Sequence, residues 1–255
     1  MIINHNIAAL NTQRNLNLNN TEANKSMEKL SSGLRINRAA DDAAGLSISE
    51  NMRGQIRGLE QAQRNTQDGI SYVQTAEGAM NEVSSMLTRM KELNVEKSNG
   101  TYSSDDTANI DQELSELGAQ IDKIMTNTTF NGISITKGVD IVTDDTGTTI
   151  SINSISTGSF SGLDSGTSLE SITDAITAVA SERAKLGAKQ NRLEYTSNNL
   201  GTTVENLTAA ESRIRDTDMA SEMVKLTKNN ILLQASQSML TQANSSTQGV
   251  LSLLR

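Results

Sequence analysis

Proline is absent from all 255 residues of this chain. Average usage of about 5% would supply roughly a dozen prolines. Because a proline inside a helix removes a backbone hydrogen bond and clashes with the preceding turn, its absence permits long unbroken helices. Aromatic residues account for only 2% of the chain, and tryptophan is absent. Since aromatic side chains usually supply much of a globular core, the remaining Leu, Ile, Val, Ala and Met suit thin seams between helices.

Apolar residues recur at steps of three and four over most of the chain, which predicts helices at about 3–33, 44–99, 105–126 and 169–255. The ten methionines are expected to fill the seams between these helices. The longest heptad series lies in the last helix. We expect its members to form the main seam of a rod: Leu186, Leu193, Leu200, Leu207 and Ile214.

The heptad pattern changes phase near residues 215–220. A second apolar series then follows, made of Val224, Leu226, Ile231, Leu233 and Leu240. The shift predicts a break between two helical units, with an N-terminal counterpart near 35–44, so that each unit is built from both ends of the chain. On the seam of the second series we expect two polar residues that weaken pairing, Asn230 and Gln237. The C-terminal stretch is therefore expected to be poorly ordered in the free monomer.

The segment at about 130–167 has a different pattern. Ile133 and Ile135 alternate with polar residues, as do Ile150 and Ile152, which predicts a small β-hairpin. Residues 158–166 are rich in Gly and Ser and are expected to be irregular and exposed. The predicted fold class is mainly α: a long antiparallel coiled coil or helical bundle with a small β-hairpin insert.

Charge and residue usage argue against several classes of function. The formal net charge of −8 disfavours nucleic acid, whose binding relies on Lys and Arg. The chain has no Cys and a single histidine, His5, so neither thiolate chemistry nor a zinc site or His-based triad is available. No apolar run approaches the ~20 residues of a membrane span, and the N-terminus lacks the features of a cleavable secretion signal. We expect no metal, no cofactor and no enzymatic activity.

Two short motifs have competing interpretations. Residues 54–58 have the G-x-x-x-G spacing that lets helices approach closely, and the neighbouring arginines favour such packing in a soluble bundle over a membrane. Arg35 and Arg38 are followed by Asp41 and Asp42. These four residues could form ion pairs, or an aspartate could cap the helix that follows. We favour capping, because a negative charge is stabilising at a helix N-terminus.

Several longer motifs, near both ends of the chain, are similar to those of bacterial flagellin. The resemblance covers about 1–135 and 170–255, in the right order, whereas 136–168 carry no match. The motifs are LSSGLRINRAADDAAGL (30–46), QDGISYVQTAEGAM (67–80), RAKLGAKQNRLE (183–194) and NLTAAESRIRDTDMA (206–220).

The resemblance implies a structural subunit that polymerises into the flagellar filament for swimming motility, with a hook–filament junction protein as the alternative. It implies export through the flagellar type III apparatus to an extracellular location. An inner coiled-coil domain, disordered in the monomer, would comprise 1–43 and 214–255, and a rod-like helical domain would comprise 44–213 with the variable insert at 131–168. The implied partners are further copies of the chain, an export chaperone, the filament cap and junction proteins, and vertebrate Toll-like receptor 5.

The resemblance also implies two groups of binding residues. Arg89, Glu92 and Leu93 lie in a segment similar to the one that Toll-like receptor 5 reads in many flagellins. In the alternative interpretation, Leu93 belongs to a helix seam and the two charged residues to a solvated face. This segment departs from common versions of the motif at Thr88, Met90, Lys91, Asn94 and Glu96. The stripe for assembly and chaperone binding would comprise Met223, Leu226, Ile231, Leu233 and Leu240.

Overall fold

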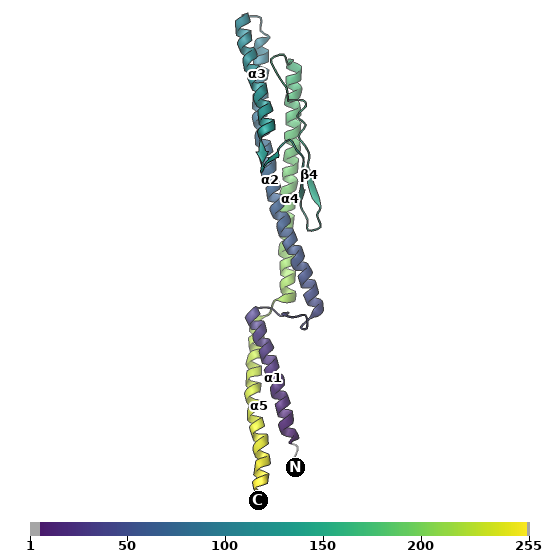
Figure 1. Ribbon diagram of the computed structural model, residues 1–255, viewed down its shortest axis with the longest axis vertical. Coiled ribbons are helices and arrows are strands. Elements are labelled where there is room, and N and C mark those ends of the chain that lie inside the picture. The colour runs from purple at the N-terminus through teal and green to yellow at the C-terminus, as the bar shows by residue number, and fades with distance from the viewer. Residues whose placement is uncertain (1–5, 254–255) are drawn as a thin grey trace. The chain divides into compact units, whose positions relative to one another are not determined.

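The computed structural model describes residues 6–253, with the side chains of 247, 248 and 250–253 left undescribed. The predicted helix start at residue 3 and His5 lie outside this range. The helices of the described residues are α1 (Ile7–Ser32), α2 (Ala43–Lys97), α3 (Ser104–Asn127), α4 (Leu169–Arg215) and α5 (Met219–Leu253) (Figure 1). The mainly helical fold class is confirmed, as are the breaks in helix near 35–44 and 215–220.

Contacts along the chain divide it into two compact units. Residues up to Gly54 and from Leu207 onward form what we call the terminal unit, and Gln55–Asn206 form the central unit. The first is built from both ends of the chain, which is the arrangement that the phase shift predicted. The assignment of an inner domain and a rod domain to particular residue ranges stays a prediction.

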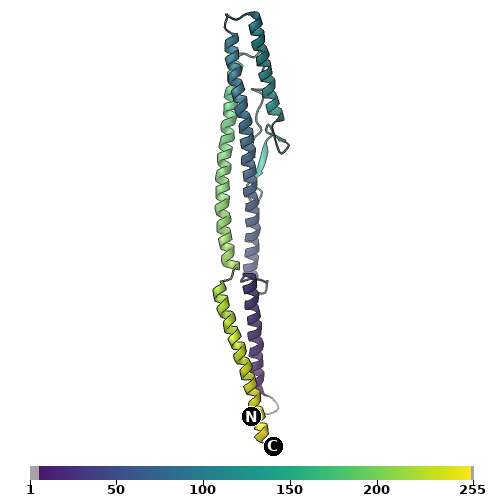
Figure 2. The same cartoon turned by 90° about the vertical axis from the view of Figure 1, so that its left-hand side faces the viewer.

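In the terminal unit, α1 and α5 run side by side in opposite directions (Figure 2). The side chain of Asn6 caps α1 by accepting a hydrogen bond from the Ala9 amide at 3.1 Å. The helix ends at Gly33, whose φ of 73° is left-handed and whose amide donates to the Lys29 carbonyl. Glycine adopts this conformation without the steric penalty of a side chain, so the sequence itself stops α1 here.

The core of the central unit lies between α2, α3 and α4 and continues under the strands. Each helix contributes buried apolar residues at steps of three and four, such as Val73, Ala76, Met80, Val83, Leu87 and Met90 on α2. At the start of α3, Ser103 and Asp106 form a capping box in which each side chain accepts a hydrogen bond from the backbone of the other. The cap explains why α3 begins at Ser104.

The insert contains two small hairpins instead of the single one expected. Strands β1 (Thr129–Phe130) and β2 (Ile133–Ser134) pair through a tight turn, in which Asn131 and Gly132 both have positive φ. Strands β3 (Val139–Val142) and β4 (Thr149–Ile152) form the second antiparallel pair. The prediction of one hairpin overlooked the alternating apolar residues of β3, which supply the partner for β4.

Tyr72 anchors the first hairpin to α2. Its hydroxyl donates to the Lys137 carbonyl at 2.7 Å, and the carbonyl oxygens of Ser134 and Ile135 lie within 3.3 Å. The ring packs edge-on against Phe130, with 6.0 Å between the ring centroids. Burial raises the pKa of the Tyr72 phenol, which keeps the hydroxyl protonated as a donor.

Of two expectations about glycine-rich segments, the first holds for most of its residues but fails at Phe160, and the second is wrong. Residues 158–166 are irregular, but Phe160 is fully buried, because Asp122 accepts hydrogen bonds from Ser161 and the Gly162 amide and holds the segment against α3. The G-x-x-x-G motif does not bring two helices together. A Cβ at Gly54 would meet no atom within 4 Å, whereas one at Gly58 would lie 2.7 Å from Asp145 in the turn between β3 and β4.

Candidate functional site

The facing sides of α1 and α5 are largely small or polar. On α1, the residues turned toward α5 follow steps of three and four: Ala9, Thr12, Leu16, Asn19, Ala23, Ser26 and Leu30. On α5, the matching residues are Glu222, Leu226, Asn229, Leu233, Ser236, Leu240 and Ala243. Leu16 and Leu30 of α1 and the three leucines of α5 bring large apolar groups to this seam. Its other side chains therefore stabilise the pair weakly, as polar seam residues do in coiled coils.

Hydrogen bonds set the register of this pair. The Asn6 side chain donates to the Ala243 carbonyl at 3.0 Å, and that of Asn19 donates to the Ser236 hydroxyl at 3.3 Å. Glu222 is buried against Ser26 and forms an ion pair with Lys225 at 2.9 Å. Burial raises the pKa of Glu222, but the hydrogen bonds from Lys225 and Ser26 outweigh it, so that the pKa is lowered overall.

The predicted seam positions of Asn230 and Gln237 are wrong, since both residues are exposed. Asn229 and Ser236 occupy the seam instead. The reason is geometric: a heptad seam alternates steps of three and four, and the step after Leu226 and Leu233 is three. The expectation of a polar seam is met by different residues.

Other apolar residues of the terminal unit lie on the faces turned away from the seam. Leu16 faces α5, whereas Leu18, two residues and about 200° further around α1, is exposed together with Ile7 and Leu10. On α5, Val224 is 69% exposed and Ile231 is 60% exposed. These two residues, with Met223, Thr227 and Lys228, line a shallow hollow of about 380 Å³. We call these two sets the outer stripes of α1 and α5.

The structure divides the residues of the expected assembly and chaperone stripe between two faces. Leu226, Leu233 and Leu240 are half-buried in the seam with α1. Met223 and Ile231 are exposed on the outer stripe. The seven-residue spacing of the leucines therefore identified the internal seam. The outer stripe is formed by residues outside that seven-residue series, such as Met223 and Ile231.

The expected rod seam of α4 is buried only along part of its length. Leu186, Leu193 and Leu200 are buried in the central unit. Leu207 and Ile214, which belong to the terminal unit, are half-buried.

The turns that follow α1 and α4 are joined by backbone and side-chain hydrogen bonds. The Arg35 amide donates to the Arg215 carbonyl at 2.6 Å, and the Arg35 guanidinium donates to the Ile214 carbonyl at 2.6 and 3.1 Å. Asp42 caps α2 by accepting from the Gly45 amide at 2.9 Å, and it also lies 3.8 Å from Arg35. Asp42 thus both caps the helix and pairs with an arginine, so the two interpretations of the segment 35–42, ion pairing and capping, both apply.

Other charged groups support the same turns. Arg38 forms an ion pair with Glu28 at 3.0 Å, and Arg215 forms one with Glu50 at 2.6 Å. Asp41 accepts hydrogen bonds from the Arg38 and Asn37 amides, which lower the pKa of its carboxyl group.

The residues of the expected receptor segment do not share one environment. Arg89 is exposed and forms ion pairs with Glu113 at 3.1 Å and Glu92 at 3.4 Å, which raise the pKa of its guanidinium. Leu93 is only 2% exposed and belongs to the core. A partner approaching this face therefore meets Arg89, Glu92 and Glu113, but not the Leu93 side chain.

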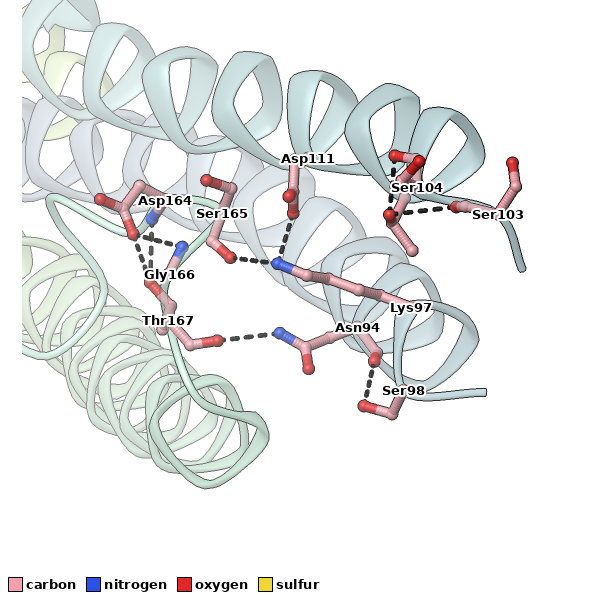
Figure 3. A network of polar contacts seen from close by, with 11 residues as sticks. Asn94, Lys97, Ser98, Ser103, Ser104, Asp111, Asp164, Ser165, Gly166 and Thr167 are labelled. Carbon is pink, nitrogen blue, oxygen red and sulfur yellow. Dashed lines mark hydrogen bonds and ion pairs between the residues drawn. The ribbon is translucent and has the colours of Figure 1, made fainter. Parts of the chain in front are cut away.

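One turn further along α2, a polar network holds the loop before α4 (Figure 3). The Asn94 side chain donates to the Thr167 carbonyl at 2.8 Å. Lys97 donates to the Ser165 carbonyl at 2.9 Å and forms an ion pair with Asp111 of α3 at 2.5 Å. The network was not foreseen from the sequence, because its carbonyl acceptors lie about 70 residues from the donors and leave no periodic signal.

Among the described residues, no helix is long and apolar enough to cross a membrane. In that same part of the chain, no three histidine or carboxylate side chains are grouped so as to hold a metal ion. The features that stand out are the exposed apolar residues of the outer stripes.

The comparisons with known proteins agree with one another over both ends of the chain. The family model described as "Bacterial flagellin N-terminal helical region" matches residues 3–140, and "Bacterial flagellin C-terminal helical region" matches residues 169–254. A flagellin from Halalkalibacterium halodurans is 51% identical, and one from Bacillus subtilis is 49% identical, each over the full length of both chains. A flagellar filament 33 kDa core protein from Treponema phagedenis is 44% identical, also over both full lengths.

Proposed function

The chain belongs to the bacterial flagellin family and is a structural subunit of the bacterial flagellar filament; from this premise we propose that the outer stripes of α1 and α5 are the surface through which it polymerises. A hook–filament junction protein is not favoured, because the relatives that match over their full length are flagellins and a filament core protein.

The placement of apolar side chains supports this proposal. Val224 and Ile231 are more than half exposed, whereas the seam that α5 shares with α1 contains Asn229 and Ser236. A helix pair whose seam mixes leucines with polar residues, and which leaves other apolar side chains outside, gains less from its own pairing than a fully apolar seam would give. It gains more when another copy covers the outer stripes, since burying a side chain such as isoleucine contributes about 1.5–3 kcal/mol.

Polymerisation would then be coupled to ordering of the chain ends. In this proposal the terminal helices, at 1–43 and 214–255, are disordered in the monomer and become fixed when neighbouring subunits bury their outer stripes. The polar seam between α1 and α5 supports this view, because it holds the two helices in register without stabilising the pair strongly. Until assembly, the exposed stripe of α5 suits an export chaperone, and export would lead to an extracellular filament.

The experiment that tests the assembly surface is seeded elongation of purified chain on short filament fragments, followed by electron microscopy and circular dichroism. Ile231→Asp places a charge in the outer stripe and should raise the critical concentration at least about tenfold, since about 1.4 kcal/mol corresponds to a factor of ten. Asn230→Asp, which adds the same charge to the neighbouring exposed residue, is the matched control and should stay within about twofold of wild type. Elongation of Ile231→Asp at the wild-type rate would contradict the proposal.

Recognition by Toll-like receptor 5 is a separate proposal, supported by the exposure of Arg89 and Glu92. Because Leu93 is buried, the charged pair would provide the contact, with Leu93 holding α2 in place. Arg89→Ala should reduce receptor signalling by monomeric protein in a reporter cell line, and unchanged potency would reject this role. The filament cap and the junction proteins remain proposed partners on family grounds.

A further inference from the structure

The methionines of this chain fall into two groups by exposure. Among the described residues, the well-exposed ones are Met27, Met219, Met223 and Met239, at 48% to 61%, and all belong to the terminal unit. The other described methionines are buried or half-buried: Met52 in the terminal unit, and Met80, Met86, Met90 and Met125 in the central unit. The expectation that methionine serves only as seam filler is therefore wrong for α1 and α5.

The composition leaves these thioethers with few competitors for an oxidant. The chain has no cysteine and no tryptophan, and cysteine thiolates are the side chains that peroxides otherwise oxidise readily. Reaction at methionine follows exposure of the sulfur. An oxidant that meets the unassembled chain should therefore react first with the four exposed methionines of the terminal unit.

We propose that Met27, Met219, Met223 and Met239 are a modification site for peroxide-class oxidants, and that their conversion to sulfoxides blocks polymerisation of the free subunit. In this step the sulfur lone pair attacks one oxygen of hydrogen peroxide. An S–O bond forms as the O–O bond breaks, the sulfur loses two electrons, and the second oxygen leaves as water after proton transfer. The product is methionine sulfoxide, with no other co-reactant required.

The location of Met223 connects this reaction to assembly. Met223 lines the hollow of the outer stripe together with Val224 and Ile231. A sulfoxide there replaces a flexible apolar group with a polar oxygen, which loses its hydrogen bonds to water when a neighbouring subunit covers the hollow. Each sulfoxide buried without a partner should weaken association by about tenfold. This inference rests on the proposed role of the outer stripes.

The first measurement is the order of oxidation. Purified unassembled protein is treated with hydrogen peroxide, and peptide mass spectrometry follows each methionine over time. We expect the four exposed residues to react at least about tenfold faster than Met80, Met90 and Met125. Equal rates across both groups would overturn the proposed selectivity.

The second measurement is seeded elongation of the oxidised protein. Wild-type protein should need at least about tenfold more subunit to elongate, and methionine sulfoxide reductases A and B with dithiothreitol should restore the original value. A variant with all four residues changed to leucine should elongate after peroxide as it did before peroxide, whatever its own starting rate, whereas the control Met86→Leu should stay sensitive. Normal elongation of fully oxidised wild-type chain, or a loss that the reductases do not reverse, would overturn the proposal, even if the leucine variant did not fold.

The result can be separated from a failure of the proposed assembly surface. If Ile231→Asp blocks elongation but oxidised wild type elongates normally, the outer stripe is the assembly surface and the methionine inference is wrong. If Ile231→Asp also elongates normally, the assembly surface itself is wrong.

Discussion

A single methyl group at Gly118 of α3 would test the packing of the central unit. A Cβ placed there would overlap the carbonyl oxygen of Leu163 and would lie 2.9 Å from its carbonyl carbon. Both are backbone atoms, so a change of rotamer cannot relieve the contact and the segment around Leu163 has to withdraw. We therefore expect Gly118→Ala to destabilise the protein, although alanine is favoured over glycine inside a helix by about 1 kcal/mol.

The size of the effect follows from what the segment buries. Overpacking a filled site costs about 1–3 kcal/mol. The upper end corresponds to release of Phe160, which is fully buried two residues before Gly162, since burial of such a side chain contributes up to about 3 kcal/mol. After the helix gain is subtracted, Gly118→Ala should lower the free energy of unfolding by up to about 2 kcal/mol.

Gly78 supplies the matched control, because it lies inside α2 and a methyl group added to it would meet no atom within 4 Å. Gly78→Ala should raise the free energy of unfolding by about 0.5–1 kcal/mol. Guanidinium unfolding followed by circular dichroism gives both values, and limited proteolysis reports whether the 158–166 segment has loosened. If the two variants changed stability by the same amount within about 0.5 kcal/mol, the close approach of α3 to Leu163 would be refuted.

Four further variants test other contacts. Leu193→Ala should lower the free energy of unfolding by about 2–5 kcal/mol, because Leu193 is fully buried. Leu207→Ala, at a half-buried position of the same heptad series, should lower it clearly less. Equal losses in denaturant titrations would contradict the burial pattern. Tyr72→Phe should cost about 1–2 kcal/mol by leaving the Lys137 carbonyl without its donor, measured by the same titrations with wild type as reference. Because the pKa of Glu222 is lowered, its carboxylate contributes to the stability of the folded protein above the ordinary pKa of 4.5, and this contribution is lost as pH falls through the lower folded pKa. The helicity of the α1–α5 pair should therefore decline over that acid range in wild type and be less pH-dependent in Glu222→Gln.

Helix boundaries were predictable because caps and periodicity are local. The left-handed Gly33, the capping box at Ser103 and the change of heptad phase near Arg215 each mark an end that the structure contains. The leucine series of α4 likewise identified Leu186, Leu193 and Leu200 as core. In each case the signal and the structure it specifies lie within a few residues of one another.

The contacts that the sequence did not reveal depend on partners far along the chain. Gly58 gives no sign in the sequence that its neighbour is Asp145 in a distant turn. The burial of Phe160 depends on Asp122, 39 or 40 residues before the groups it binds. Nor could a list of apolar positions show which face of α5 the first helix covers, so the outer stripe and the seam were combined into one predicted surface.

The hydrogen bonds from Arg35 to Ile214 join positions 179 residues apart in the chain. Synthesis proceeds from the N-terminus, so the central unit can complete its local helix pairings while this long loop is still open. Closing such a loop costs chain entropy before any contact within the terminal unit compensates for it. The terminal unit is consequently the last part of the chain able to fold. Premature termination within α5 would expose the seam face of α1 in addition to its outer stripe.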